Sequence, residues 1–426
     1  MLGALVISFV LLLFFGVPIA YSMGISSAIA IVTCSDVPWL VLPQRIFVAI
    51  DSFPMMAIPL FILAGELMNG GGITKRIVSF SSSLVGHITG GLAHVNIVGS
   101  MFFAGISGSA AADTASLGSI LIPAMVKDGY EPAFAVAVTA SAGTIGPIIP
   151  PSILMIIYGS ITGISIGALF LGGFVPGVLI GLALMITAYI IARKRGYKAA
   201  VKATMAQRWI AFKGSILALI MPCIILGGIL SGVFTATEAG VVALVYGLIV
   251  GFATKELKLN QLKKIFVDSA ITSATVMYVI GSAQIMGWIL AREQFPQYIV
   301  KTLLSISNNG TVIFLLIAFV LFILGFFVDA TALLIILAPV FVPVVNMFGY
   351  DPVQFAVVAI MTLLVGGVTP PVGVLLFISC GIAKIKLSEG SRMIWPFVTA
   401  MIVIILACIF IPQLTTFVPF HVLGKV

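Results

Sequence analysis

The sequence has 426 residues, of which 61% are hydrophobic and only 8% are charged. Such a chain has too few polar side chains to cover a water-soluble globule of its length, which excludes a soluble enzyme or binding domain. The formal net charge of +8 would suggest nucleic-acid binding in a soluble protein, but the densest basic run is confined to residues 193–213, between apolar segments. We therefore interpret the charge as a signal of membrane orientation and expect no nucleic-acid partner.

The sequence predicts an all-α polytopic membrane protein, and its first 91 residues are expected to form scaffold helices and a first arm helix. A helix needs roughly 20 apolar residues to cross the hydrocarbon core of a bilayer, and several stretches of the chain approach or exceed that length. The helices expected in this first part span residues 2–15, 19–35, 45–68 and 73–88.

Residues 92–192 are predicted to form a first transport half. The stretch 92–126 is apolar with a polar interruption at 105–109, and as one helix it would be far longer than the bilayer requires. We interpret it as a re-entrant hairpin, which enters the membrane, turns at mid-depth and leaves by the same side. A broken helix over 133–163, interrupted at 143–151, and a closing helix over 168–192 are expected to follow.

The rest of the chain is predicted to repeat this order. Residues 193–213 form a basic cytoplasmic linker, and residues 214–305 form further scaffold helices and a second arm helix. A second transport half is expected over 311–426. Its parts are a hairpin over 311–347 with its turn at 325–329, a broken helix over 353–383 interrupted at 366–371, and a closing helix over 390–417.

A repeat with an offset of 220 residues links the two transport halves. The segment Gly-Tyr-Glu-Pro at 129–132 recurs as Gly-Tyr-Asp-Pro at 349–352, and the Pro-Pro pair at 150–151 recurs at 370–371. Proline and glycine mark the places where helices break, so the two halves are expected to break in the same places. Such matched breaks in apolar segments point to the binding site of a secondary transporter.

The distribution of basic residues predicts that the two halves are inverted. If the first hairpin opens to the cytoplasm and the second to the outside, most Lys and Arg residues fall on the cytoplasmic side, as the positive-inside rule requires. Both termini are then expected on the non-cytoplasmic side. The basic residues left outside are Arg45, Arg292, Lys301 and Lys425.

The hairpin turns and helix breaks are the places where ions could bind. Freed carbonyl oxygens and hydroxyls at mid-membrane can coordinate Na⁺, which is therefore the cofactor we expect. The candidate Na⁺ ligands are Ser107, Gly108, Ser109, Thr144 and Gly146 in the first half, and Gly325, Asp329, Thr331, Gly366 and Thr369 in the second.

Half-helix N-termini at the same places present N–H groups, which favour an anionic substrate. The alternative for Asp113 and Asp329 is that their carboxylates only cap helix N-termini, and capping does not exclude a role in shaping an ion site. The candidate substrate-binding residues are Ser109, Asp113, Thr144, Pro147, Asp329, Thr331 and Pro370.

A few further residues are functional candidates. Glu238 starts a helix at an apolar boundary and fits a capping box poorly, so it is a candidate functional residue or, alternatively, a helix-start or interdomain contact. Prolines at the two breaks, Pro150, Pro151 and Pro371, complete the set. The histidines show no metal-ligand spacing, there is no phosphate-binding loop with its lysine, and an intramembrane protease suits the repeated hairpins poorly, so we expect no enzymatic activity.

Several motifs together resemble the large membrane subunit of TRAP transporters, the tripartite ATP-independent periplasmic family. The similar stretches run through nearly the whole chain in the family's order. They are Gly-Ile-Ser-Gly-Ser-Ala-Ala-Ala-Asp at 105–113, Ser-Ile-Leu-Ile-Pro-Ala-Met at 119–125, Gly-Thr-Ile-Gly-Pro-Ile-Ile-Pro-Pro-Ser at 143–152, Phe-Thr-Ala-Thr-Glu-Ala-Gly at 234–240 and Val-Thr-Pro-Pro-Val-Gly at 368–373.

The resemblance implies a multi-pass protein of the bacterial inner membrane that imports a small organic acid anion with Na⁺ by an elevator mechanism. The substrate would be of the C4-dicarboxylate or sialic acid type. Two protein partners are implied, a small membrane subunit and a periplasmic substrate-binding protein. The alternatives are a stand-alone Na⁺-coupled dicarboxylate carrier of the divalent-anion type, whose Ser-Asn-Thr hairpin turns this chain lacks, and a channel or structural membrane subunit.

Overall fold

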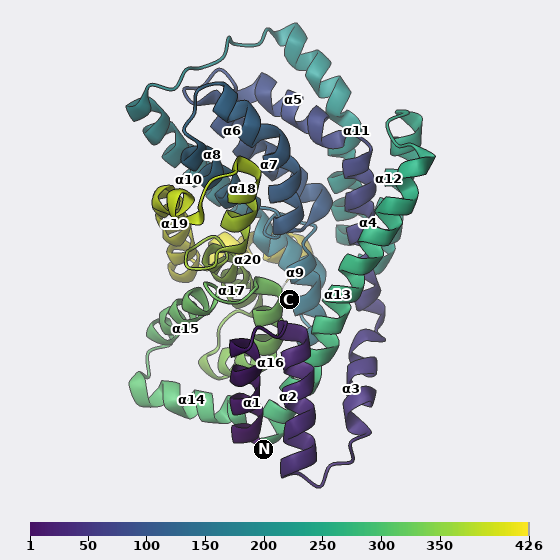
Figure 1. The fold of residues 1–426 in the computed structure, drawn as a ribbon, viewed down its shortest axis with the longest axis vertical. Coiled ribbons are helices and arrows are strands. Elements are labelled where there is room, and N and C mark those ends of the chain that lie inside the picture. Colours follow the sequence, from purple (N-terminus) through teal and green to yellow (C-terminus); the bar gives the residue numbers. More distant parts are fainter. Residues whose placement is uncertain (425–426) are drawn as a thin grey trace.

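The computed structural model describes residues 1–424, and within them every regular element is a helix (Figure 1). Lys425, one of the basic residues expected outside, lies beyond the described residues. The helices of the first part of the chain are α1 (Leu2–Phe14), α2 (Ile19–Cys34), α3 (Val41–Ile50), η1 (Phe53–Met56), α4 (Ala57–Gly70), α5 (Ile73–Val85), α6 (Gly91–Ser107), α7 (Ala110–Lys127), α8 (Pro132–Gly143), α9 (Ile153–Thr162) and α10 (Ile166–Arg195).

The second part repeats this order from the end of the basic linker onward. Its helices are α11 (Met205–Leu230), α12 (Ala236–Ala253), α13 (Leu259–Arg292), α14 (Phe295–Ile306), α15 (Gly310–Leu324), α16 (Ala330–Phe348), α17 (Pro352–Gly366), α18 (Val374–Ala383), α19 (Leu387–Phe410) and α20 (Gln413–Leu423).

The length and apolar character of these helices fit a polytopic membrane protein. Seven helices in the described part of the chain are long and apolar enough to cross a bilayer. An eighth crossing results if α14 and α15, which are bent by 119° at a short break, are counted as one. The remaining apolar helices are shorter, and several of them belong to the hairpins and broken helices.

Both hairpins turn at the predicted residues. In the first, α6 ends at Ser107, Gly108 adopts a positive φ of 63°, and Ser109 caps α7. In the second, α15 ends at Leu324, and Asp329 caps α16 by accepting the Thr331 N–H at 2.9 Å. Figure 1 shows α6 and α7 in the upper part of the molecule and α15 and α16 in the lower part, with the arm helices α5 and α14 near opposite ends. The two halves are therefore inverted repeats.

Three predicted boundaries were wrong. The helix expected over 45–68 is divided into α3, η1 and α4, because Ser52 is extended and Pro54 starts a separate short turn. The basic linker is shorter than 193–213, since α10 continues to Arg195 and a capping box at Thr204 starts α11. The closing helix expected over 390–417 ends at Phe410, and α20 follows Pro412.

Gln354 stabilises the end of α19. Pro412 has no N–H to donate, so the carbonyl of Cys408 loses its helical partner. The buried Gln354 side chain on α17 replaces it, because its Nε2 donates to the carbonyls of Cys408 and Ile409 at 2.9 and 3.2 Å. This contact joins the broken helix of the second half to the helix that closes it.

The second hairpin turn packs directly on the break between α17 and α18. A Cβ atom built on Gly366 would lie 2.7 Å from the Cα of Gly325, and one built on Gly325 would lie 3.0 Å from the Cα of Gly366. Backbone therefore lies against backbone at this contact, and neither position has room for a side chain.

We expect Gly366→Ala to destabilise the folded protein by about 1–3 kcal/mol, because the added methyl group must displace the hairpin backbone. The measurement is the thermal unfolding midpoint of the purified protein in detergent. Gly381→Ala on α18 is the matched control, since a Cβ atom there meets nothing within 4 Å. Equal midpoints for the two variants would contradict the contact.

We also expect Gln354→Ala to lower stability by about 1–3 kcal/mol, because it leaves buried carbonyl groups without a hydrogen-bond donor. The same unfolding assay measures the effect, with Gln297→Ala on the exposed face of α14 as control. A midpoint for Gln354→Ala that matches the control would show that the α17–α19 hydrogen bonds contribute nothing.

Candidate functional site

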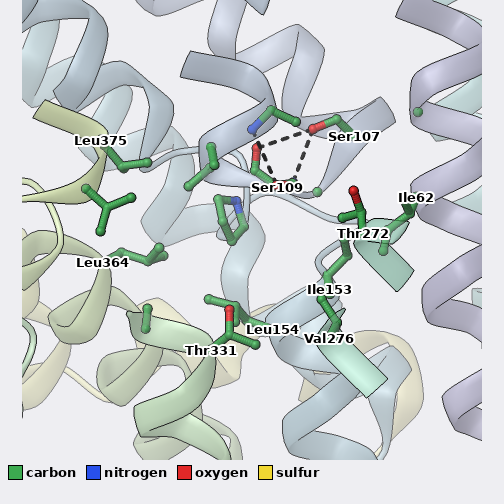
Figure 2. Close-up of a pocket in the computed structure, with 18 of the residues that line it drawn as sticks. Ile62, Ser107, Ser109, Ile153, Leu154, Thr272, Val276, Thr331, Leu364 and Leu375 are labelled. Atoms are coloured by element: carbon green, nitrogen blue, oxygen red, sulfur yellow. Dashed lines mark hydrogen bonds between the residues drawn. The ribbon is translucent and has the colours of Figure 1, made fainter. Parts of the chain in front are cut away.

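A cavity of about 170 Å³ lies where the two hairpin turns approach each other. The first turn contributes Ser107, Gly108 and Ser109, and the second contributes Asp329 and Thr331. Figure 2 shows Ser107 and Ser109 on one side of this space and Thr331 across from them. Residues from both halves of the chain, more than 200 positions apart in the sequence, therefore line one cavity.

Helices outside the hairpins complete the cavity wall. Helix α4 contributes Ile62, Gly65, Glu66 and Asn69, and α13 contributes Thr272 and Val276 one turn apart. Figure 2 shows Ile62, Thr272 and Val276 together on one side of the space. Among these residues the sequence indicates only Glu66, as an ionisable residue in an apolar segment. The helices α4 and α13 look like ordinary spanning helices, without a repeat or a break at these positions.

The first hairpin turn is held by hydrogen bonds among its own residues. The Ser109 N–H donates to the Ser107 hydroxyl oxygen at 3.1 Å, and the Ser107 hydroxyl donates to a carboxylate oxygen of Asp113. Asp113 lies one turn inside α7 and is 0% exposed. A buried carboxylate thus stabilises the turn through the Ser107 hydroxyl.

One oxygen of Asp113 remains available for a cation. Its Oδ2 atom has no hydrogen-bond partner among the described residues. It faces the break between α8 and α9, where a Cβ atom on Gly146 would collide with it. An unpaired carboxylate oxygen inside a protein is costly, and a bound cation is one way to offset that cost. The donor set at this place therefore fits Na⁺.

The other first-half candidates have different positions. Pro147 lines the cavity, whereas Thr144 and Gly146 are buried behind it. The Thr144 hydroxyl donates to the Ser141 carbonyl at 2.7 Å, which leaves its oxygen lone pairs free to accept or to coordinate. Pro150 and Pro151 are buried, and the carbonyl of Pro151 packs close to Gly108. The peptide bond between these prolines is cis.

The second-half candidates are not equivalent to those of the first half. The 220-residue offset pairs Asp329 with Ser109, and both of these residues cap helices. The same offset pairs Asp113 with Leu333. The second half has no carboxylate at the Asp113 position. Asp329 is exposed in the cavity and accepts the Thr331 N–H, which agrees with the capping alternative. Its second carboxylate oxygen forms no hydrogen bond within residues 1–424.

The break in the second half presents few polar side chains to the cavity. Gly325 and Gly366 pack on each other, and the buried Thr369 hydroxyl donates to the Val365 carbonyl at 2.7 Å. The peptide bond between Pro370 and Pro371 is cis, as in the first half. Of the residues expected to bind ions or substrate in this half, the structure brings only Asp329 and Thr331 to the cavity.

Glu238 does form a capping box, contrary to our expectation from the sequence. Its carboxylate accepts the Thr235 N–H at 2.8 Å, and the Thr235 hydroxyl oxygen accepts the Glu238 N–H at 3.3 Å. The box starts α12, and the side chain is exposed and does not line the cavity. The structure therefore supports the helix-start alternative for this residue.

The charges around the cavity are all negative within the described residues. Glu66 and Asp329 line it, Asp113 lies behind it, and no Lys, Arg or His belongs to its wall. No cluster of three or more His, Cys, Asp or Glu side chains in residues 1–424 could hold a transition metal. A cation bound here would be coordinated by hydroxyl, carbonyl and isolated carboxylate oxygens, the ligands that suit Na⁺.

Comparison with known proteins agrees with this architecture. A solved structure of the YdaH transporter of Alcanivorax borkumensis is similar in fold, with a TM-score of 0.59 over 91% of this chain and 90% of that one, at 14% identity. That identity shows the fold alone.

Sequence comparison is more specific. The family described as "Tripartite ATP-independent periplasmic transporter, DctM component" matches residues 6–414. The sialic acid TRAP transporter large permease protein SiaM of Vibrio cholerae is 40% identical, over 97% of each chain. The C4-dicarboxylate TRAP transporter large permease protein DctM of Pseudomonas aeruginosa is 35% identical, over 93% of each chain. This chain therefore belongs to the DctM family of TRAP transporter large permease subunits.

Proposed function

We propose that this chain imports a small organic acid anion together with Na⁺. The observation that carries the proposal is the cavity between the two hairpin turns, which has carboxylates but no cationic side chain in its described wall. A carboxylate substrate would be repelled from such a cavity if it entered alone. Cations that bind first at the turns and breaks would offset most of the local negative charge and make the half-helix N-termini available to the anion.

In this proposal, Na⁺ binds at two sites of unequal affinity. In the first half, Na⁺ lies between the Asp113 carboxylate, Ser107 and the break at Thr144 and Gly146. In the second half, the ligands are carbonyl oxygens near Gly325 and Gly366 with the hydroxyl of Thr369. The carboxylate of the substrate then lies in the cavity, near Ser109, Pro147 and Thr331, and the free oxygen of Asp329 is available to a cation.

The membrane potential supplies the driving force. Each net positive charge that moves inward gains about 2.3 kcal/mol per 100 mV of inside-negative potential. An anion accompanied by excess Na⁺ is therefore concentrated in the cell, whereas the anion alone would move uphill. The cavity lies between the hairpins and helices α4 and α13, so we propose that the two transport halves move as one body against these scaffold helices.

Family membership supports a proposal about two partners and a location. The relatives' names describe large permeases of tripartite periplasmic systems. We propose that this chain works in a bacterial inner membrane with a small membrane subunit and a periplasmic substrate-binding protein, with both termini on the periplasmic side. The organic acid would be of the C4-dicarboxylate or sialic acid type.

Uptake into proteoliposomes tests the function. We expect an inward Na⁺ gradient to drive uptake of a labelled organic acid, from a panel that includes N-acetylneuraminate and succinate, only when the small subunit and the binding protein are both present. A K⁺ gradient of the same size is the control. Uptake without a binding protein would place the chain among stand-alone carriers, and equal uptake in the Na⁺ and K⁺ gradients would contradict Na⁺ coupling.

Asp113→Asn tests the first ion site. We expect the Na⁺ concentration for half-maximal ²²Na⁺ binding to rise at least about tenfold, because an amide oxygen lacks the charge that attracts the ion. Asparagine can still accept the Ser107 hydroxyl, so the turn should fold. Asp128→Asn, at an exposed loop, is the matched control. Unchanged Na⁺ binding by a folded Asp113→Asn protein would remove Asp113 from the site.

A further inference from the structure

Glu66 lies on α4 between two points of contact with the first hairpin. The residue before it, Gly65, packs on the turn, since a Cβ atom built there would lie 3.3 Å from the Cα of Ser107. Three residues after it, the Asn69 Nδ2 donates to the Ser116 hydroxyl oxygen on α7 at 2.9 Å. Glu66 lines the cavity between these contacts. Its position relative to the first turn is therefore fixed by packing on one side and by a hydrogen bond on the other.

The carboxylate of Glu66 has no protein partner. Within residues 1–424 it forms no hydrogen bond and no ion pair with another residue. The other acidic side chains of the nearby helices and loops differ from it. Glu256 pairs with Arg76 at 2.7 Å, Glu238 caps α12, and Asp268 is exposed on α13 and does not line the cavity. Glu66 is therefore the unpaired charge that this group of helices presents to the first turn.

A second, independent observation supports a cation site at that turn. The Oδ2 atom of Asp113 is buried without a partner among the described residues, and Asp113 holds the Ser107 hydroxyl. A cation bound there would lie between Asp113, Ser107 and the break at Gly146, on the hairpin side of the cavity that Glu66 lines. The described cavity wall has no Lys, Arg or His side chain, so no cationic side chain in it screens the cation from the Glu66 carboxylate.

We propose that Glu66 is a positioning residue that strengthens Na⁺ binding at the first hairpin turn when that turn is docked against α4. The inference rests on the proposed function. Its new element is that an ion site on the moving half draws part of its affinity from a charge on the scaffold. The first site then holds Na⁺ more tightly in the docked position than after the hairpin has moved away, because the Coulomb attraction falls with distance.

Binding of ²²Na⁺ to the purified full chain in nanodiscs tests the inference. We expect Glu66→Gln to raise the Na⁺ concentration for half-maximal binding about three- to tenfold, the size expected for one carboxylate acting across a partly hydrated cavity. Glu66→Asp keeps the charge and should restore most of the affinity. Asp36→Asn removes an exposed carboxylate outside the cavity, between α2 and α3, and should leave Na⁺ binding unchanged.

Each outcome decides a different question. Equal Na⁺ affinity in Glu66→Gln and the unmodified protein would overturn the role of Glu66. A Glu66→Asp protein that binds Na⁺ as weakly as Glu66→Gln would also overturn it, because that result would indicate a role of side-chain size. Absence of saturable ²²Na⁺ binding in the unmodified protein would overturn the Na⁺-coupled function itself. Thermal unfolding midpoints of all variants confirm that the compared proteins are folded.

Discussion

The structure depends on one constraint, that polar backbone groups at mid-membrane must find partners where there is no bulk water. A helix satisfies its own backbone, so every break requires a neighbour that replaces the lost hydrogen bonds or encloses the freed groups. The chain meets this requirement by placing each hairpin turn against a break. The carbonyl of Gly108 accepts the N–H of Ile153 at 3.4 Å, and the Gly325 backbone lies on Gly366. The cavity is formed where these two turn-and-break pairs meet.

Much of the fold could be predicted because helix breaks follow local chemistry. Proline lacks an N–H and glycine tolerates unusual backbone angles, so their positions in the sequence located both hairpin turns and both breaks. The 220-residue repeat gave each of these positions a second, independent observation. The errors also had local causes. The Glu238 capping box depends on a side-chain conformation. The division of the helix expected over 45–68 depends on the non-helical residues Asp51 and Ser52 and on Pro54 in the first turn of η1.

The cavity wall could be predicted only in part, since side chains from distant helices meet through tertiary packing. Nothing near Asn69 or Thr272 in the sequence indicates that α4 and α13 face the hairpins. The two aspartates of the hairpins also differ. The repeat pairs Asp329 with Ser109 and not with Asp113, and the structure buries Asp113 and exposes Asp329 as a cap. The two halves share a backbone plan and differ in the chemistry placed on it.

The contact between Gly325 and Gly366 also restricts how the second hairpin can move. Side chains can change rotamer and let neighbouring helices slide apart, but two glycines in contact have no side chain with which to do so. To swing open as a flap, the turn would have to separate backbone from backbone and leave a void at the break. The contact therefore ties the second turn to its broken helix as one closely packed unit, with no flexible side chain at the seam.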